Sequence, residues 1–177
     1  MIKIKDYDNN FDESLFISKV DNIFIQLIDA IMQRDLSNIK HYLSNEVYNK
    51  YNTLIDSYKN DKKIRIFEEM NVKSSAIIDS YIKDNNINIE VVLTSRYIDY
   101  FINEEGEYLS GNNSSRVIKN NYITLSKKLT AKDLGSARRC PSCGNTLNIN
   151  QSGVCPYCKN TIDMSNYDYI VTSMEVK

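Results

Sequence analysis

The sequence predicts an α+β protein in which N-terminal helices pack on a curved, cone-like antiparallel sheet. From about Phe11 to Tyr58 apolar residues recur every three to four positions, as in amphipathic helices, and after that they recur every two positions, as in strands. Turn-forming residues separate the later segments at hairpin spacing. Four cysteines then lie close together before a last apolar stretch, which predicts a small zinc ribbon inserted before the final strand.

The first helix is expected to begin near Phe11. Residues 1–10 are charged and polar, and they are expected to form a flexible N-terminal segment. Asn10 or Asp12 can cap the helix, because their side chains accept hydrogen bonds from free backbone N–H groups of the first turn. The apolar face of this helix is expected to contain Leu15, Phe16, Val20, Ile23, Phe24, Leu27, Ile28 and Ile31.

Two further helices are expected before the pattern changes. A short one covers residues 36–43, and Ser44 or Asn45 can cap the next. The charged and polar run at residues 59–63 ends that last helix. Its apolar face is expected to contain Val47, Tyr48, Tyr51, Leu54, Ile55 and Tyr58.

Alternating residues then predict a sheet built from hairpins. Residues 72–82 alternate in polarity, 84–86 form a turn, and the next strand places Ile87, Ile89, Val91 and Leu93 on one face. After Arg96 the apolar phase shifts by one residue, to Ile98, Tyr100 and Ile102. Such a shift is typical of a β-bulge, and it would turn Asp99 outward toward water.

The remaining segments complete the sheet. Turns are expected at residues 103–106 and 111–113, and a long strand at 116–129. The domain boundaries follow from these elements: 11–135 for the cone-like domain, 136–163 for the zinc ribbon, and 164–177 for a final strand that returns to the sheet. The apolar part of that last strand runs from Tyr167 to Val176.

The cysteines predict a structural metal site. Cys140, Cys143, Cys155 and Cys158 form two Cys-x-x-Cys pairs, which can supply the closed tetrahedral shell of four thiolates that Zn²⁺ favours. Gly144 follows the first pair and is expected to take a positive φ and turn its N–H toward a sulfur; Lys159 and Asn160 follow the second, and Asn tolerates such geometry best after Gly. The residues between the pairs, 145–154, are expected to form a minimal hairpin.

Other uses of the cysteines are less consistent with the sequence. Disulfides need an oxidising compartment, and the N-terminus has no secretory signal. Iron is the alternative metal, because the iron-binding turns of rubredoxins are similar, but their two pairs lie much farther apart in sequence. Four protein sulfurs leave no open position for water, so a catalytic zinc is not expected.

Composition excludes several classes of protein. The 177 residues carry a formal charge of −1 and are 42% hydrophobic, which allows a packed core but gives no basic excess for dominant binding to nucleic acid. No apolar run is long enough to span a bilayer. We therefore expect a cytoplasmic protein, with peripheral membrane association and homodimerisation as open alternatives.

The order of these motifs resembles a known domain family. Residues 28–36 and 42–48, the two cysteine turns and the closing residues 167–171 resemble the family named after the matrix tether of the mitochondrial inner-membrane translocase, and in particular its bacterial members with a zinc ribbon. The resemblance implies a nuclear-transport-factor-two-like cone whose sheet wraps around helices and leaves an apolar pocket. It also implies a domain that attaches to membrane surfaces and protein partners.

Three functions remain open. The first is a non-enzymatic binding or scaffold module for a protein, a lipid surface or a small apolar ligand, because no nucleophile motif or phosphate loop is present. The second is a small pocket enzyme that performs acid–base chemistry; its candidate groups are His41, Tyr97, Asp99 and Tyr122. The third is nucleic-acid binding through the ribbon; its candidate groups are Lys127, Lys128, Lys132, Arg138 and Arg139.

Overall fold

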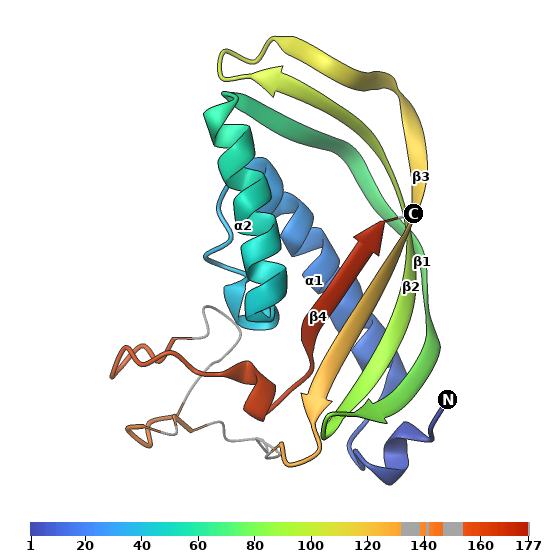
Figure 1. Cartoon of the computed structure of the whole chain (residues 1–177), viewed down its shortest axis with the longest axis vertical. Coiled ribbons are helices and arrows are strands. Elements are labelled where there is room, and N and C mark those ends of the chain that lie inside the picture. The colour runs from blue at the N-terminus through green and yellow to red at the C-terminus, as the bar shows by residue number, and fades with distance from the viewer. Residues whose placement is uncertain (132–138, 141, 147–153, 177) are drawn as a thin grey trace.

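A computed structural model shows two α-helices packed on one face of a curved four-stranded sheet (Figure 1). The structure describes residues 1–131, 139–140, 142–146 and 154–176. All neighbouring strands are antiparallel, and their order in the sheet is their order in the chain. The predicted α+β class is confirmed. The strands are β1 (Lys63–Lys83), β2 (Asn86–Asn103), β3 (Tyr108–Lys128) and β4 (Ile170–Val176).

Helix α1 (Glu13–Gln33) begins where the sequence predicts. The Asp12 carboxylate accepts a hydrogen bond from the Leu15 N–H at 2.9 Å, which satisfies one of the free donors of the first turn. The predicted apolar face of α1 is buried except at Leu15, which is 73% exposed. The segment before α1 differs from the expectation of a flexible tail. It contains a short 3₁₀-helix, η1 (Ile4–Asp6), and the Ile2 N–H donates to the Ser80 carbonyl of β1.

Helix α2 (Asn45–Asn60) is capped by Ser44, whose hydroxyl accepts from the Val47 N–H at 3.2 Å. The predicted helix at residues 36–43 is wrong, because the structure has only a single 3₁₀ turn there, η2 (Lys40–Tyr42). Leu36, Ile39 and Leu43 are nevertheless buried. In so short a segment, burial of these apolar side chains fixes the chain without continuous α-helical hydrogen bonding.

The centre of the core is formed by β2. Ile87, Ile89, Val91 and Leu93 are at most 1% exposed, which confirms their predicted common face. They form one cluster with side chains of α1, α2, β3 and β4. The 84–86 turn and the 103–106 turn also form as predicted.

The predicted bulge in β2 is wrong. The extra residues in the β1–β2 ladder lie on β1, one of them at Glu69 with a φ of 54°, and those in the β2–β3 ladder lie on β3. Strand β2 therefore keeps its alternation, and Asp99 lies on the same face as Tyr97 and Phe101, toward the helices. Ile98, on the opposite face, is also buried, at 9% exposed. Because both faces of this part of β2 carry buried apolar side chains, the sequence pattern does not show which face points toward the helices.

Strands β1 and β3 are longer than predicted. Strand β1 begins at Lys63, and β3 runs through the turn expected at 111–113. Gly111 has a φ of +100°, and a Cβ there would meet the Tyr100 Cα at 2.7 Å. The glycine therefore permits a close approach between two strands instead of a reversal of the chain.

The final strand returns to the sheet as predicted. Strand β4 pairs with β3, and its other edge meets the segment before α2, where the Ser44 N–H donates to the Val171 carbonyl at 2.8 Å. Two lysine side chains also donate to carbonyls at this edge: Lys19 to Tyr169 and Lys50 to Met174. A 3₁₀-helix, η3 (Met164–Asn166), precedes β4.

Candidate metal centre

The four cysteine sulfurs converge at one point. The Cys140 and Cys158 sulfurs lie 3.6 Å apart, those of Cys143 and Cys155 lie 3.7 Å apart, and all four are within 4.8 Å of one another. A disulfide would require an S–S distance of about 2.0 Å. Tetrahedral zinc, with Zn–S bonds of about 2.3 Å, places its sulfurs about 3.8 Å apart. The cluster therefore has the size of a four-thiolate metal shell, and it can hold a metal ion such as zinc.

The two cysteine turns have the same backbone hydrogen bonds. The Gly144 N–H donates to the Cys140 carbonyl and the Lys159 N–H to the Cys155 carbonyl, each at 2.9 Å. Gly144 takes the predicted positive φ, but its N–H binds this carbonyl and not a sulfur. In the second turn Lys159, and not Asn160, occupies the left-handed region, with a φ of 62°.

Hydrogen bonds act in opposite directions on two of the neighbouring thiols. The Asn160 backbone N–H favours the Cys158 thiolate, but desolvation and hydrogen bonds with Cys140, Cys155 and Cys143 raise the pKa of that thiol to about 12. The backbone N–H groups of Cys143 and Ser142 donate toward the Cys140 sulfur, and with the neighbouring thiols they lower the pKa of that thiol to about 6, although desolvation opposes them. The Asn145 side-chain amide donates to the Cys143 sulfur at 3.5 Å. A lowered thiol pKa favours metal binding at neutral pH, because the thiolate is the ligand.

The cysteine turns are connected to the sheet by apolar packing. Cys140 and Cys155 are buried together with Ile162 and Met164, and Ile170, the first residue of β4, packs against the same cluster. Isolated bridges join Arg139 to Thr146 and Val154 to Thr161. We call residues 139–163 the cysteine module. Most of the hairpin predicted at 145–154 falls on residues 147–153, which lie outside the described part of the chain.

The Tim44-like domain matches residues 1–135 of this chain. The chain belongs to the Tim44-like family. The matched residues include both helices and strands β1–β3, so this part of the resemblance is confirmed. The cysteine module and β4 lie beyond them. No curated protein matches the sequence. Among the described residues, no helix combines the length and apolar character needed to cross a membrane.

The candidate acid–base groups of this Tim44-like chain do not form one site. Tyr97 and Asp99 face the helices, Tyr122 lies on the opposite face of the sheet from its buried neighbour Ile123, and His41 lies in η2. His41 and Asp99 lie at opposite ends of α2. His41 is in η2, which precedes the first residue of the helix, whereas Asp99 lies near Tyr58 in the last turn of the helix. A helix of its 16 residues is about 24 Å long.

Asp99 instead forms an ion pair that the sequence did not reveal. Both of its carboxylate oxygens accept hydrogen bonds from Arg65, at 2.9 and 2.8 Å, and Arg65 also donates to the Tyr58 hydroxyl. The Arg65 guanidinium lies over the rings of Phe67 and Phe101. This arrangement ties β1 and β2 to the end of α2. Arg65 stands in an ordinary basic run in the sequence, and nothing there marks it as the partner of Asp99.

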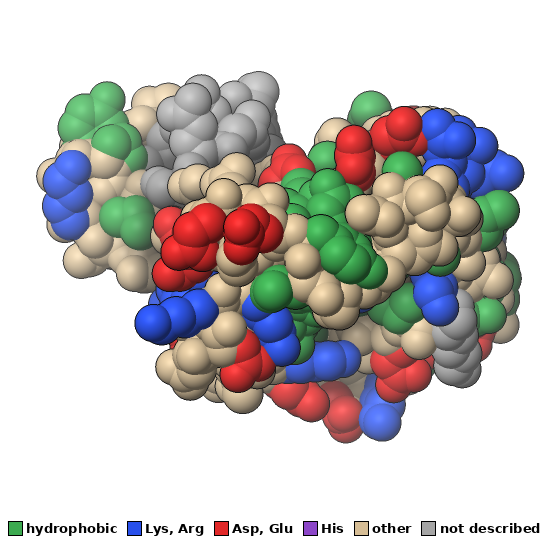
Figure 2. All heavy atoms as spheres, turned by 90° about the horizontal axis from the view of Figure 1, so that it is seen from above, with side chains coloured by type: hydrophobic (Ala, Val, Ile, Leu, Met, Phe, Trp, Pro, Cys, Tyr) green, Lys and Arg blue, Asp and Glu red, His purple; other side chains and the backbone are tan. Residues whose placement is uncertain are grey.

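The basic residues near the module are largely engaged elsewhere. Lys127 forms an ion pair with Asp8 at 2.8 Å, and Lys128 donates to Asn166 at 2.6 Å and lies 3.8 Å from the Asp163 carboxylate. Lys132 and Arg138 fall outside the described residues. On the face drawn in Figure 2, lysine and arginine side chains are interspersed with acidic ones instead of forming a continuous stripe. This distribution does not favour nucleic-acid binding.

Proposed function

We propose that this chain is a non-enzymatic binding or scaffold module in which one Zn²⁺, held by Cys140, Cys143, Cys155 and Cys158, fixes the path of the chain into β4. The observation that supports this proposal is the cluster of four sulfurs at tetrahedral distances, packed against Ile162, Met164 and Ile170 next to β4. Four thiolates complete the coordination of zinc, so the ion would stabilise the fold and would leave no position for a substrate.

The partner that we propose is a protein, a lipid surface or a small apolar ligand. Membership of the Tim44-like family supports a tethering or scaffold role, and the curved sheet with helices on one face supports a cone of the nuclear-transport-factor-two type. A reducing compartment such as the cytoplasm suits a site made of four thiolates. Binding of the pure protein to liposomes and to candidate peptides would test the tethering role, and absence of binding to all of them would contradict it.

Metal analysis tests the zinc site directly. We expect one zinc per chain, and replacement by Co²⁺ should give the absorption of a tetrahedral four-thiolate site. One iron per chain, with its visible colour, would contradict the assignment to zinc. Cys140→Ser should abolish stoichiometric binding, whereas Ser142→Ala, at a residue between the two cysteines that supplies no thiolate, should retain it.

Hydrogen exchange tests whether the metal fixes β4. After chelation, or in Cys140→Ser, the amides of β4 should exchange faster, because the apolar cluster that leads into this strand loses its metal anchor. The amides of β2, in the centre of the sheet, should remain protected. If chelation leaves the exchange of β4 unchanged, the cysteine module is an independent appendage and the proposal fails.

A further inference from the structure

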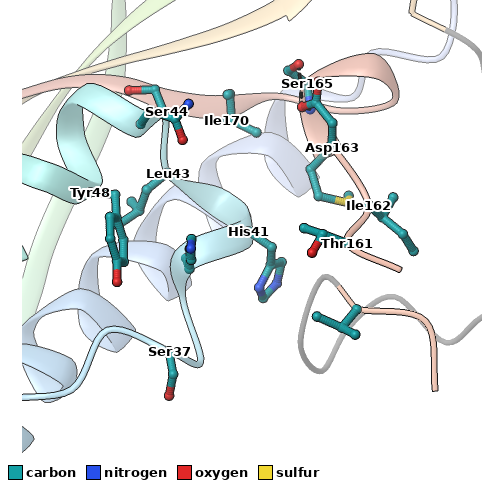
Figure 3. Close-up of a pocket in the computed structure, with 14 residues that line it drawn as sticks. Ser37, His41, Leu43, Ser44, Tyr48, Thr161, Ile162, Asp163, Ser165 and Ile170 are labelled. Atoms are coloured by element: carbon teal, nitrogen blue, oxygen red, sulfur yellow. Dashed lines mark hydrogen bonds between the residues drawn. The ribbon is translucent and has the colours of Figure 1, made fainter. Parts of the chain in front are cut away.

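A pocket lies between the helical layer and the cysteine module. It has a volume of about 770 Å³ and lies between η2, the first turn of α2, and the segment that leads from the module to β4. In Figure 3 the His41 ring extends from η2 toward Thr161 and Ile162 on the opposite wall. Ligand sites for small molecules commonly occupy roughly 300–1,000 Å³, so a metabolite-sized molecule would fit here.

The pocket contains a histidine with unused hydrogen-bonding capacity. Both ring nitrogens of His41 are buried, and neither has a hydrogen-bond partner among the described residues. Burial lowers the pKa of this imidazole, and the positive charge of Lys19 lowers it further, so the ring is neutral at pH 7 and offers one donor and one acceptor. A buried polar group without a hydrogen-bond partner destabilises the folded protein, and a ligand that bonds to His41 would remove that cost.

The charges of the pocket favour an anion. Lys40 forms no ion pair with any carboxylate of the described residues, and its ammonium lies 4.8 Å from the centre of the Tyr48 ring. The Asp163 carboxylate is already occupied, because it accepts hydrogen bonds from Ser165 and Asn166 and lies 3.8 Å from the Lys128 ammonium. The lysine charge is therefore available to a ligand, whereas the aspartate charge is compensated.

The remaining lining combines uncharged polar residues, among them Ser44, Thr161 and Ser165, with an apolar part. Leu43, Ile162 and Met164 are buried side chains that contribute to the wall, and Ile170 completes it. We propose that this pocket binds a small organic anion, a carboxylate or a phosphate monoester on a short aliphatic chain, with its charged group at Lys40 and His41. The inference rests on the proposed binding function, because one wall belongs to the segment that the metal would fix.

The single histidine of the chain makes the test specific. The zinc-loaded full chain is titrated with hexanoate and with hexyl phosphate, and the His41 ring signals are followed by NMR. Hexan-1-ol has the same apolar chain without the charge, and acetate has the charge without the chain. At least one of the two hexyl anions should shift the His41 signals saturably, with an affinity at least tenfold higher than that of hexanol or acetate.

Two matched variants locate the anion. Lys40→Gln should weaken binding of the hexyl anion by about tenfold, because it removes the available charge. Lys59→Gln makes the same change in the last turn of α2, outside the pocket, and should leave the affinity unchanged. Failure of both hexyl anions to shift His41, equal binding of hexanol, or equal loss in the two variants would each overturn the proposal.

The metal content separates this proposal from the scaffold function. If neither hexyl anion binds to protein that holds one zinc and keeps β4 protected from exchange, the ligand proposal fails and the scaffold proposal stands. If the zinc is absent or chelation does not affect β4, the scaffold proposal fails on that measurement, independently of the titration.

Discussion

Gly144 and Lys159 occupy the same position in the two cysteine turns, but only glycine suits that position without strain. Both have a positive φ, and both donate the same hydrogen bond to the first cysteine of their pair. A left-handed conformation costs a residue with a Cβ about 1 kcal/mol relative to glycine. The second turn therefore retains backbone strain that the first turn avoids.

Exchanging these residues should change zinc affinity in opposite directions. Gly144→Ala should weaken zinc binding about fivefold, or about 1 kcal/mol, because a Cβ at Gly144 meets no atom within 4 Å and the backbone strain is the remaining cost. Lys159→Gly should strengthen binding by a smaller factor. Competition with a chromophoric chelator measures the zinc affinity of both variants. A loss of affinity in Lys159→Gly would contradict the explanation by backbone strain.

Removing one partner of the Arg65–Asp99 ion pair should destabilise the protein, because it leaves the other charge unpaired. Asp99→Ala leaves the Arg65 side chain, which is only 28% exposed, without its bidentate partner. We expect a loss of about 2 kcal/mol in the free energy of unfolding, measured with urea. The double variant Arg65→Met with Asp99→Leu should recover part of this loss, since an apolar pair leaves no unpaired charge. A double variant less stable than the single one would contradict this explanation.

His41 should make stability depend on pH. Burial and the Lys19 charge lower its folded-state pKa below the unfolded value of about 6.5. As pH falls below 6.5 the unfolded chain takes up the proton first, so the folded protein loses stability until His41 is protonated in both states. Between pH 7.5 and 6.0 the wild type should therefore lose more stability than His41→Gln in urea unfolding at constant zinc content. Equal losses would show that His41 is not responsible.

At the scale of elements, the sequence predicts the buried side of a helix or strand well where only one face is buried, and poorly where both faces are buried. The caps at Asp12 and Ser44 and the inner face of β2 from Ile87 to Leu93 could be predicted, because periodicity and capping chemistry are local. The apolar phase shift in β2 predicts a bulge in the wrong strand, because Ile98 is buried on the outer face of β2 and the extra residues lie on β1 and β3. The pairing of Arg65 with Asp99 depends on the register between strands, which the sequence does not contain.

The outer edge of β4 is closed by groups from the helical layer. The Lys50 ammonium donates to the Met174 carbonyl at 2.8 Å, Lys19 donates to the Tyr169 carbonyl, and the Ser44 N–H donates to Val171. An unpaired strand edge is a template for association with other chains, and bonds of this kind occupy its acceptors. The lysines also connect α1 and α2 directly to the last strand.

Removing one of these lysine contacts should loosen β4 selectively. Lys50→Met keeps the apolar stem but loses the ammonium, and a hydrogen bond to a charged group contributes about 1.5–3 kcal/mol. We expect faster amide exchange in β4 and a fall of about 1 kcal/mol in stability, because water replaces part of the bond. Lys59→Met, at the exposed end of the same helix, is the matched control and should have no effect. Equal exchange in both variants would contradict this role of Lys50.

Over the whole molecule, the family match ends before the fold does. The Tim44-like match stops at residue 135, but the fourth strand of the sheet comes from residues 170–176. The structure brings this strand back through the cysteine module, whose apolar cluster continues into Ile170. The spacing of the cysteines predicted their common site, and this return explains their position in the chain. Apolar packing therefore connects the cysteine module to the last strand of the sheet.

A chain that ends at residue 135 should be much less stable than the full protein. It lacks Tyr169, Val171 and Met174, which are at most 4% exposed in the common core. Each buried side chain of this size contributes about 1.5–3 kcal/mol, so their joint loss, roughly 5 kcal/mol, is comparable with the total stability of a small domain. Urea unfolding should rank the zinc-loaded full chain above the chelated full chain, and the chelated chain above the truncated one, because β4 remains covalently attached in the second. If the truncated chain were as stable as the full one, β4 and the cysteine module would be dispensable to the fold.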